Sequence, residues 1–448
     1  MVGAIFTTFT NMNILSIIAL LAVLATNPDI EYSGRIDFGE PEAPCFSYSG
    51  VSIRACIDAT EANAIIDDEI GGNRFALIVD NVYTGKITTQ RGRGSYQVFR
   101  SQAKETHEIE LVRITEADFG KTKFAGFELS NDGKIMPIGH QRKHVIEFVG
   151  NSITCGYGNE GRIGQRFGAE TENHYLTYAA IAARSFDAAT IVASKSGIGV
   201  YRNYAGPSTG NEDCMPNRYD RIHLYDSLPK YSFSIQPDLI CINLGTNDFS
   251  TPGYQANLFV SNYLRLIADI QSRYKNPDIV CLLGTMLTDK ALDTARHCIK
   301  MVVDSANSWN KGRVSFFEMT PQNIRANGLG IDYHPTVRQH IASARELVEF
   351  IGQLKGWQVT EQIVFAQVTG NNQLTLFANS AACLHSKAMS SLAVTADNRT
   401  IKPANLQIDD SNATLTLTFD EDLHQFEHII LSGNAELNNF LRRREVVF

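Results

Sequence analysis

The chain of 448 residues is longer than one ordinary domain and predicts two or three domains. Its hydrophobic fraction of 44% and its charged fraction of 20% are typical of a soluble globular protein. The net charge of -8 is spread along the chain, which gives no electrostatic reason to expect a nucleic-acid partner.

An apolar run from Asn13 to Ala25 predicts a signal peptide within residues 1–25. The run is too short to span a bilayer comfortably, and Val23 and Ala25 are small residues at the spacing of a signal-peptidase site. No Lys or Arg precedes the run, so the basic n-region is missing even if the chain starts at Met12. We expect a secreted or periplasmic protein without membrane contact after signal removal; the alternative is a disordered or misassigned N-terminus.

Residues 30–140 contain short runs of β-branched and aromatic residues, with turn residues at Gly71-Gly72-Asn73 and Asn131-Asp132-Gly133. This pattern predicts an N-terminal β-sandwich or jelly roll, most simply without an activity of its own. The expected strands are 51–55, 64–66, 75–79, 95–99, 106–114 and 123–129.

Residues 143–356 alternate between strand-like and helix-like segments, which predicts an α/β domain with a parallel sheet and helices on both faces. The expected strands are 145–149, 190–193, 239–244, 279–283 and 314–317. The expected helices are 175–186, 258–274, 290–309 and 337–354.

Residues 360–448 return to short strands and predict a small immunoglobulin-like β domain. The expected strands are 363–367, 373–377, 392–395, 413–419 and 427–431. None of these runs presents an aromatic platform, so spacing or structural support is favoured over carbohydrate attachment.

The eight cysteines show no C-x-x-C pair and no zinc-like spacing, so no metal site is implied. Cys241 and Cys281 lie in apolar runs and are most simply core residues. In an oxidising compartment Cys45 could pair with Cys56, or Cys155 with Cys214, but the spacing does not decide between them.

Ser152 is the strongest candidate for a nucleophile. It follows the apolar run that ends at Gly150, and the carboxyl end of a buried parallel strand is where open α/β sheets bind their ligands. A serine nucleophile needs a base, and His334 lies in a loop directly before the last helix of the α/β region. Asp332, two residues earlier, is placed to accept a hydrogen bond from Nδ1 of that histidine.

Donors for a developing oxyanion follow the two other strands. Asn247 comes three residues after the run 239–244 and offers a neutral amide, although most loop asparagines simply form turns. Gly197 or Gly199, after the run 190–193, lets the backbone approach a ligand closely and donate an N–H.

Four blocks together resemble the SGNH, or GDSL-like, hydrolases: Gly150-Asn-Ser, the glycine at 197, Gly245-x-Asn-Asp and Asp332-x-His. Longer matches resemble carbohydrate esterase family 2, the acetyl xylan esterase-like group. They are G-N-S-I-T-C-G-Y-G (150–158), T-E-N-x-Y-L-T-Y (171–178), G-V-Y-R-N-Y (199–204) and M-P-N-R-Y-D-R (215–221). The resemblance covers residues 30–355 and implies an N-terminal β-sandwich joined to an SGNH hydrolase domain.

The resemblance implies a role for each matched residue. Ser152 becomes the nucleophile and His334 the general base and acid, while the backbone N–H groups of Ser152 and Gly197 and the side chain of Asn247 form the oxyanion hole. Asp332 is the implied third catalytic residue, with a backbone carbonyl as the rival partner of the imidazole. The chain departs from the wider superfamily at residue 151, which is Asn instead of Asp.

Three tyrosines are candidates for contacting a sugar ring: Tyr333 beside the base, and Tyr201 and Tyr204 after the oxyanion glycine. The expected function is that of a carbohydrate O-acetyl esterase acting on acetylated plant polysaccharides or oligosaccharides through an acetyl-enzyme, without a cofactor. The alternatives are an SGNH lipase or thioesterase, and a glycan-binding protein that keeps the esterase fold. The oligomeric state is open.

Overall fold

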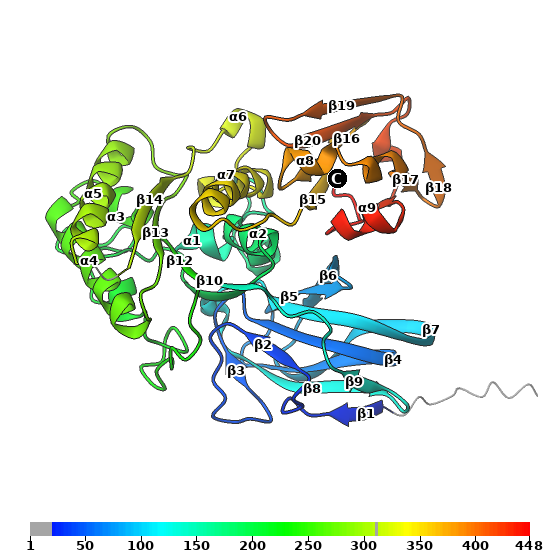
Figure 1. Cartoon of the computed structure of the whole chain (residues 1–448), viewed down its shortest axis with the longest axis horizontal. Helices are drawn as coiled ribbons and strands as arrows, with labels where there is room; N and C mark the ends of the chain where they lie inside the picture. Colours follow the sequence, from blue (N-terminus) through cyan, green and yellow to red (C-terminus); the bar gives the residue numbers. More distant parts are fainter. Residues whose placement is uncertain (1–19, 310–311) are drawn as a thin grey trace, which may run out of the picture.

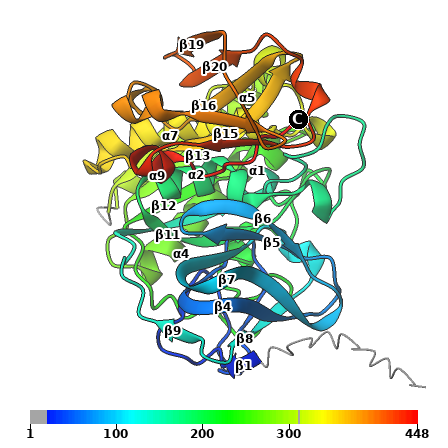
Figure 2. The ribbon, with the colours of Figure 1, turned by 90° about the vertical axis from the view of Figure 1, so that its right-hand side faces the viewer.

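The computed structural model describes residues 20–309 and 312–448, which form three parts (Figure 1). An antiparallel β domain, a central parallel sheet with flanking helices and a smaller β region follow one another along the chain. Figure 2 shows the same order in space, with the central part between the two β parts. The predicted fold class is confirmed.

The N-terminal part is a nine-stranded antiparallel sheet built around two long strands, β4 (Ser52–Asp68) and β7 (Gly92–Arg113). The main strand order is β1-β8-β4-β7-β5-β6, while β2 and β9 pair with β4, and β3 pairs with β8. The other strands are β1 (Leu20–Val23), β2 (Glu31–Ser33), β3 (Cys45–Phe46), β5 (Arg74–Val79), β6 (Val82–Thr88), β8 (Thr122–Ser130) and β9 (Lys134–Met136).

The two long strands differ from the prediction of separate short ones. Residues 51–55 and 64–66 belong to one strand, as do residues 95–99 and 106–114. Polar residues such as Asp58 and Glu61 lie between these runs. They pair directly across the β4–β7 ladder, and register shifts at Ala59/Glu61 and Ala62/Asn63 let the ladder continue past them.

The central part contains five parallel strands in the order β11-β10-β12-β13-β14, as the alternating pattern predicted. Helices α4 and α5 pack against one face of the sheet, and α2 and α7 against the other. The strands are β10 (His144–Gly150), β11 (Ala188–Ser194), β12 (Leu239–Asn243), β13 (Ile279–Leu283) and β14 (Val314–Glu318). The helices are α1 (Ser152–Cys155), α2 (Tyr178–Ser185), α3 (Thr246–Phe249), α4 (Ala256–Arg273), α5 (Asp289–Asn307), α6 (Ile324–Asn327) and α7 (Val337–Lys355).

The C-terminal part consists of two small sheets, of four and three strands, around its own apolar core. It contains β15 (Ile363–Gly370), β16 (Gln373–Ala378), β17 (Ala393–Ala396), β18 (Arg399–Ile401), β19 (Asn405–Asp409), β20 (Thr414–Thr418), β21 (Ile429–Ser432), α8 (Ala381–Leu384) and α9 (Ala435–Phe440). Its last residues reach the N-terminal part, where Tyr83 N donates to Arg442 O at 2.7 Å. All three parts therefore contact one another.

The predicted signal peptide lies largely outside the described residues. Its last residues, 20–25, include strand β1, which pairs with β8, and Leu21 and Leu24 are half-exposed there.

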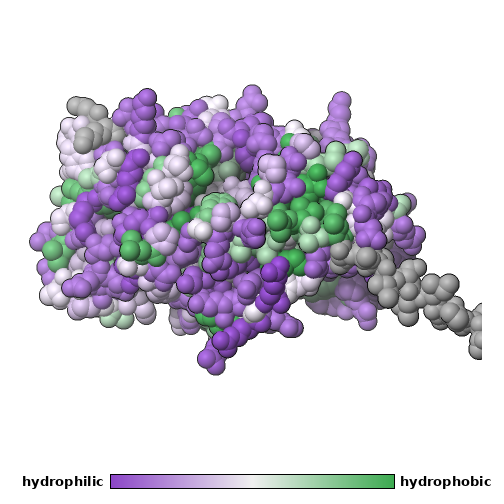
Figure 3. Space-filling view, turned by 90° about the horizontal axis from the view of Figure 1, so that it is seen from below, coloured by the Kyte–Doolittle hydropathy of each residue, from purple (hydrophilic) through white to green (hydrophobic). Residues whose placement is uncertain are grey.

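Seen from below, the surface is mainly hydrophilic, with an apolar patch on the N-terminal part (Figure 3). Among the described residues, no helix is both long and apolar enough to cross a membrane. All eight cysteines are free thiols, and six of them are buried.

Candidate active site

Three neighbouring strands deliver the candidate catalytic groups to one edge of the central sheet. The last residue of β10, Gly150, pairs with Ser194 of β11 on one side and with Asn243 of β12 on the other. The chain segments that leave these three strands therefore start side by side. They carry Ser152, Gly197 and Asn247, respectively, within four residues of the strand ends.

Ser152 is the first residue of the short helix α1. The side chain of Asn151 caps this helix, because its Oδ1 accepts a hydrogen bond from Ile153 N at 3.0 Å. Ser152 is buried, and its hydroxyl lies 2.8 Å from Nε2 of His334. The Asn that departs from the wider superfamily thus positions the helix without adding a charge beside the serine.

His334 reaches the serine from the loop before α7. Its Nδ1 lies 3.1 Å from Ile331 O and 3.2 Å from Asp332 O, so a proton on Nδ1 is donated to backbone carbonyls. This leaves the lone pair of Nε2 facing the serine hydroxyl. Burial lowers the pKa of His334 below its ordinary value of 6.5, which keeps the imidazole neutral and able to accept a proton near pH 7.

The predicted role of Asp332 as the acid of a catalytic triad is not supported by the structure. Its carboxylate accepts a hydrogen bond from the hydroxyl of Tyr157 at 2.7 Å and does not contact the imidazole. The reason is the backbone: Asp332 and Tyr333 both have positive φ, at 49° and 65°, which turns the Asp332 carbonyl, and not its side chain, toward Nδ1. The structure shows a Ser–His pair oriented by carbonyl groups.

Two backbone N–H groups at the sheet edge are free to bind an oxyanion. Neither Ser152 N nor Gly197 N donates to any group in the part of the chain that the structure describes. Gly197 has a φ of 78°, a conformation that suits glycine, whereas Gly199, the other candidate, donates its N–H to Asn203 Oδ1. The Asn247 side chain is buried and held in place by a 2.8 Å hydrogen bond from Nδ2 to Ile198 O. Its second amide proton remains available.

The loop that carries Gly197 is held by Asp248, a residue to which the sequence pattern assigned no role. Its buried carboxylate accepts hydrogen bonds from the backbone N–H groups of Val200, Tyr201 and Arg202, at 2.9 to 3.1 Å. Burial raises the pKa of Asp248 to about 6, against the opposing effect of these hydrogen bonds. The Asn-Asp pair of the third block therefore combines a candidate donor with the residue that fixes the neighbouring loop.

A second carboxylate reaches the same loop from the N-terminal part. Glu116 accepts a hydrogen bond from Ser196 N at 2.7 Å, directly before Gly197, and its own N–H donates to Glu172 at 2.8 Å. Cys155 Sγ, at the end of helix α1, lies 3.5 Å from the same oxygen of Glu116. No sequence motif could have identified Glu116, because only the fold brings it to this loop.

A possible metal-binding group lies beside α1. It consists of Glu116, Cys155 and Glu172, whose potential ligand atoms lie within 4.8 Å of one another. Burial raises the pKa of all three side chains, which favours their protonated forms. A thiol and carboxylic acids in their protonated forms are poor metal ligands. Their contacts to α1 and to the Gly197 loop indicate a structural role.

The three candidate sugar-contacting tyrosines have different environments. The prediction for Tyr201 is wrong, because its side chain is buried in the core and its hydroxyl accepts a hydrogen bond from Gln255 N at 2.7 Å. Tyr333 and Tyr204 are 64% and 65% exposed, and Tyr204 lies against Gly197. Tyr157 stacks on Phe167 and lies 4.4 Å from the His334 ring, measured between centroids.

Family models match both of the first two parts. The family described as Carbohydrate esterase 2 N-terminal matches residues 32–138, and the GDSL-like Lipase/Acylhydrolase family matches residues 148–340. Neither match reaches the C-terminal β part. The boundary between the two matches falls at the junction of the antiparallel and parallel sheets.

Known proteins show the same similarity. Cellulase/esterase CelE of Acetivibrio thermocellus is 34% identical over 333 residues, which are 74% of this chain but only 40% of that protein. Acetylxylan esterase / glucomannan deacetylase of Cellvibrio japonicus is 24% identical over 75% of this chain and 91% of its own length. The structure of a family two carbohydrate esterase from Clostridium thermocellum in complex with cellohexaose is 34% identical, with a TM-score of 0.69, over 73% of this chain and 99% of that one.

Proposed function

Because the chain belongs to carbohydrate esterase family 2, we propose that it removes acetyl groups from plant polysaccharides or oligosaccharides such as xylan, mannan or glucan. The observation that carries this proposal is the 2.8 Å contact between Ser152 Oγ and His334 Nε2 at the carboxyl edge of the sheet. A serine hydroxyl with a neutral imidazole in hydrogen-bond reach is the machinery of acyl transfer.

We propose that the reaction has two steps. Ser152 Oγ attacks the acetyl carbonyl while His334 Nε2 takes the hydroxyl proton, and His334 then returns that proton to the departing sugar oxygen. Water, deprotonated by His334, next attacks the acetyl-enzyme, and the serine leaves with the proton as acetate is released. The carbonyls of Ile331 and Asp332 accept from Nδ1 and stabilise the imidazolium that forms in both steps.

The proposed oxyanion hole consists of Ser152 N, Gly197 N and Asn247 Nδ2. Each such donor stabilises the transition state by about 2.7–4 kcal/mol. Their placement around the ends of three adjacent strands supports this role, because the negative oxygen forms within reach of the serine.

Exposed aromatic rings beside the base and the oxyanion glycine support a carbohydrate substrate. Tyr333 and Tyr204 each present a face on which a pyranose can stack its C–H surface. The similar Clostridium thermocellum structure contains cellohexaose, and the Cellvibrio japonicus relative is named a glucomannan deacetylase. We therefore place the glycan chain over these two tyrosines, with its acetyl group at Ser152.

Replacing the nucleophile tests the proposal. Ser152→Ala should lower acetate release from acetylated xylan by about ten-thousandfold or more, because no other group forms the acyl-enzyme. Ser234→Ala, an exposed serine distant in sequence from the site, is the matched control and should keep full activity. Substantial acetate release by Ser152→Ala would contradict the mechanism. Faster cleavage of long acyl esters than of acetyl esters would instead select a lipase or thioesterase.

We also propose that the protein is exported and that residues 30–140, 143–356 and 360–448 act as support, catalytic and spacer domains. A polymeric substrate outside the cell and the apolar run at residues 13–25 support export. Mass spectrometry of the protein from the culture medium tests export, because removal of the apolar run lowers its mass. Finding only the full-length protein, and only inside the cell, would exclude secretion.

A further inference from the structure

Residues from all three parts of the chain line a cavity of about 200 Å³ at their junction, which is partly open to solvent. Glu110 of β7 and Arg142 of the linker to the central sheet line it from one side. Arg184 of α2 and Asp187 line it from the central part, and Arg442 lines it from the C-terminal tail. It lies away from the candidate active site, since none of its lining residues is a candidate catalytic or oxyanion group.

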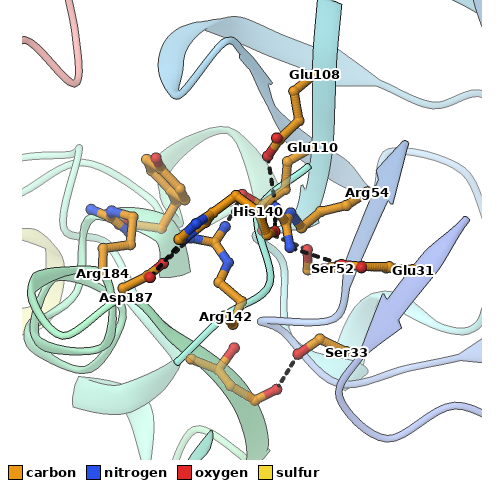
Figure 4. Close-up of polar contacts among 12 residues, drawn as sticks. Glu31, Ser33, Ser52, Arg54, Glu108, Glu110, His140, Arg142, Arg184 and Asp187 are labelled. Atoms are coloured by element: carbon orange, nitrogen blue, oxygen red, sulfur yellow. Dashed lines mark hydrogen bonds and ion pairs between the residues drawn. The ribbon is translucent and has the colours of Figure 1, made fainter. Parts of the chain in front are cut away.

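Both oxygens of each carboxylate that lines this cavity, Glu110 and Asp187, already have a partner. Glu110 accepts from Ser52 at 2.6 Å with one oxygen and pairs with Arg142 at 2.8 Å with the other. Asp187 contacts Arg142 at 3.4 Å and His140 at 2.6 Å, again with different oxygens. Figure 4 shows these paired groups at the centre and the guanidinium group of Arg184 at the left edge of the cluster.

Arg184 and Arg442 have no such partner. Arg184 donates from Nη1 to Tyr175 O, but its Nε and Nη2 are inaccessible to solvent and have no acceptor. The guanidinium group of Arg442 has no hydrogen-bond or ion-pair partner among the described residues, although its backbone is fixed by Ile363 and Tyr83. Burial lowers the pKa of both side chains. The charges of Arg184 and Arg142 lower the pKa of Arg442 further, whereas Tyr175 and Asp187 act in the opposite direction.

Arg184 is stacked on the Tyr175 ring at 3.7 Å, and its two unpartnered nitrogens do not face the cavity, so it contributes charge and not donors. Arg442 has free donors, and it shares the cavity with the positive groups of Arg142, Lys143 and Arg184. A guanidinium keeps its proton, so this surplus of positive charge persists near pH 7. An oxyanion offsets the surplus, since its oxygens accept from the planar fork of an arginine. We propose that this junction cavity binds one small oxyanion, of phosphate or carboxylate type, at the guanidinium group of Arg442.

The volume of the cavity limits the size of the ligand that it can hold. Pockets for drug-sized molecules measure about 300–1,000 Å³, so a cavity of about 200 Å³ admits a small anion with a few waters and excludes an oligosaccharide. The bound anion links α2 of the central part to the C-terminal tail. Binding therefore favours the docked arrangement of the three parts and raises the stability of the folded chain.

Titration calorimetry and thermal unfolding of the full chain test the proposal. Inorganic phosphate and acetate are added separately, each compared with KCl at the same ionic strength. We expect saturable binding and a rise in unfolding temperature with at least one of the two anions. Binding of phosphate alone assigns the site to phosphate groups, whereas binding of acetate assigns it to carboxylates, which include the proposed reaction product.

Two variants identify the site. Arg442→Gln should weaken anion binding at least tenfold and leave acetate release unchanged, because Arg442 has no part in the proposed catalysis. Lys143→Gln removes the same charge from an exposed side chain of the same cavity and should change affinity less than threefold. If Arg442→Gln does not fold, Arg442→Lys keeps the charge without the fork and should still weaken binding. The absence of saturable binding to wild type, or equal affinity in wild type and the Arg442 variant, would overturn the proposal.

Discussion

The two sides of Ser152 are organised in different ways. On the histidine side, the imidazole is oriented by the carbonyls of Ile331 and Asp332, which belong to its own loop. On the oxyanion side, buried carboxylates hold the backbone: Asp248 binds the N–H groups that follow Gly197, and Glu116 binds the one before it. The histidine side depends on carbonyl groups within four residues, whereas the oxyanion side depends on buried carboxyl groups from distant parts of the chain.

This difference indicates which changes the site tolerates. Carbonyl groups orient an imidazole without being ionised, so the proposed base His334 has an orienting partner even without a carboxylate. The donors for an oxyanion must be placed to within a fraction of an ångström, and their loop therefore requires support from other elements. Glu116 comes from the segment after β7, so the N-terminal β part contributes directly to the geometry of the site.

The largest effect is expected at the base itself. His334→Ala should lower kcat for acetyl-ester hydrolysis by about ten-thousandfold, because no other group is placed to take the Ser152 proton. Steady-state acetate release measures it, with the exposed His297→Ala as the control. A loss of less than tenfold would show that a different base operates.

Removing one oxyanion donor should have the next largest effect. Asn247→Ala is expected to lower kcat by about a hundred- to a thousandfold with little change in KM, because the amide acts mainly on the developing charge. Asn262→Ala is the control, since its Nδ2 also donates to a backbone carbonyl, Leu258 O, on a helix outside the site. An effect on KM alone would place Asn247 in substrate binding instead.

Glu116 tests the contribution of the N-terminal part. Glu116→Ala should lower kcat by about ten- to a hundredfold without changing KM, because the Gly197 loop loses the acceptor of Ser196 N. Glu116→Gln should recover most of the activity, since its amide oxygen accepts the same hydrogen bond. The exposed Glu170→Gln is the control. If Glu116→Ala and Glu116→Gln are equally impaired, the charge and not the hydrogen bond is required.

The sequence predicts the parallel sheet well because its strands are short apolar runs, each followed by a helix. It predicts β4 and β7 poorly, because polar residues such as Asp58 lie in the middle of strands that continue through them. The positions of Ser152, His334 and Asn247 at one edge of the sheet follow from strand ends and family blocks. The direction of the Asp332 carboxylate and the burial of Tyr201 do not, because backbone dihedrals and packing decide them. Glu116 lies outside every motif.

The smallest effect is expected at Asp332, and it separates a Ser–His pair from a triad. In a triad, replacing the acid by its amide lowers kcat by about ten-thousandfold. Here Asp332→Asn should lower kcat less than tenfold at pH 7, because the carbonyls of Ile331 and Asp332 still orient Nδ1. Tyr157→Phe, which removes the hydroxyl bound to the Asp332 carboxylate, should behave similarly.

The pH dependence sharpens the same test. Because burial lowers the pKa of His334, the acid limb of kcat/KM should fall below the ordinary histidine value of 6.5. The negative charge of Asp332 opposes this shift by favouring the imidazolium. Its removal should therefore move the acid limb further toward low pH while the activity at pH 7 stays nearly constant. A large loss of kcat at every pH would instead show that the carboxylate turns toward the imidazole during the reaction.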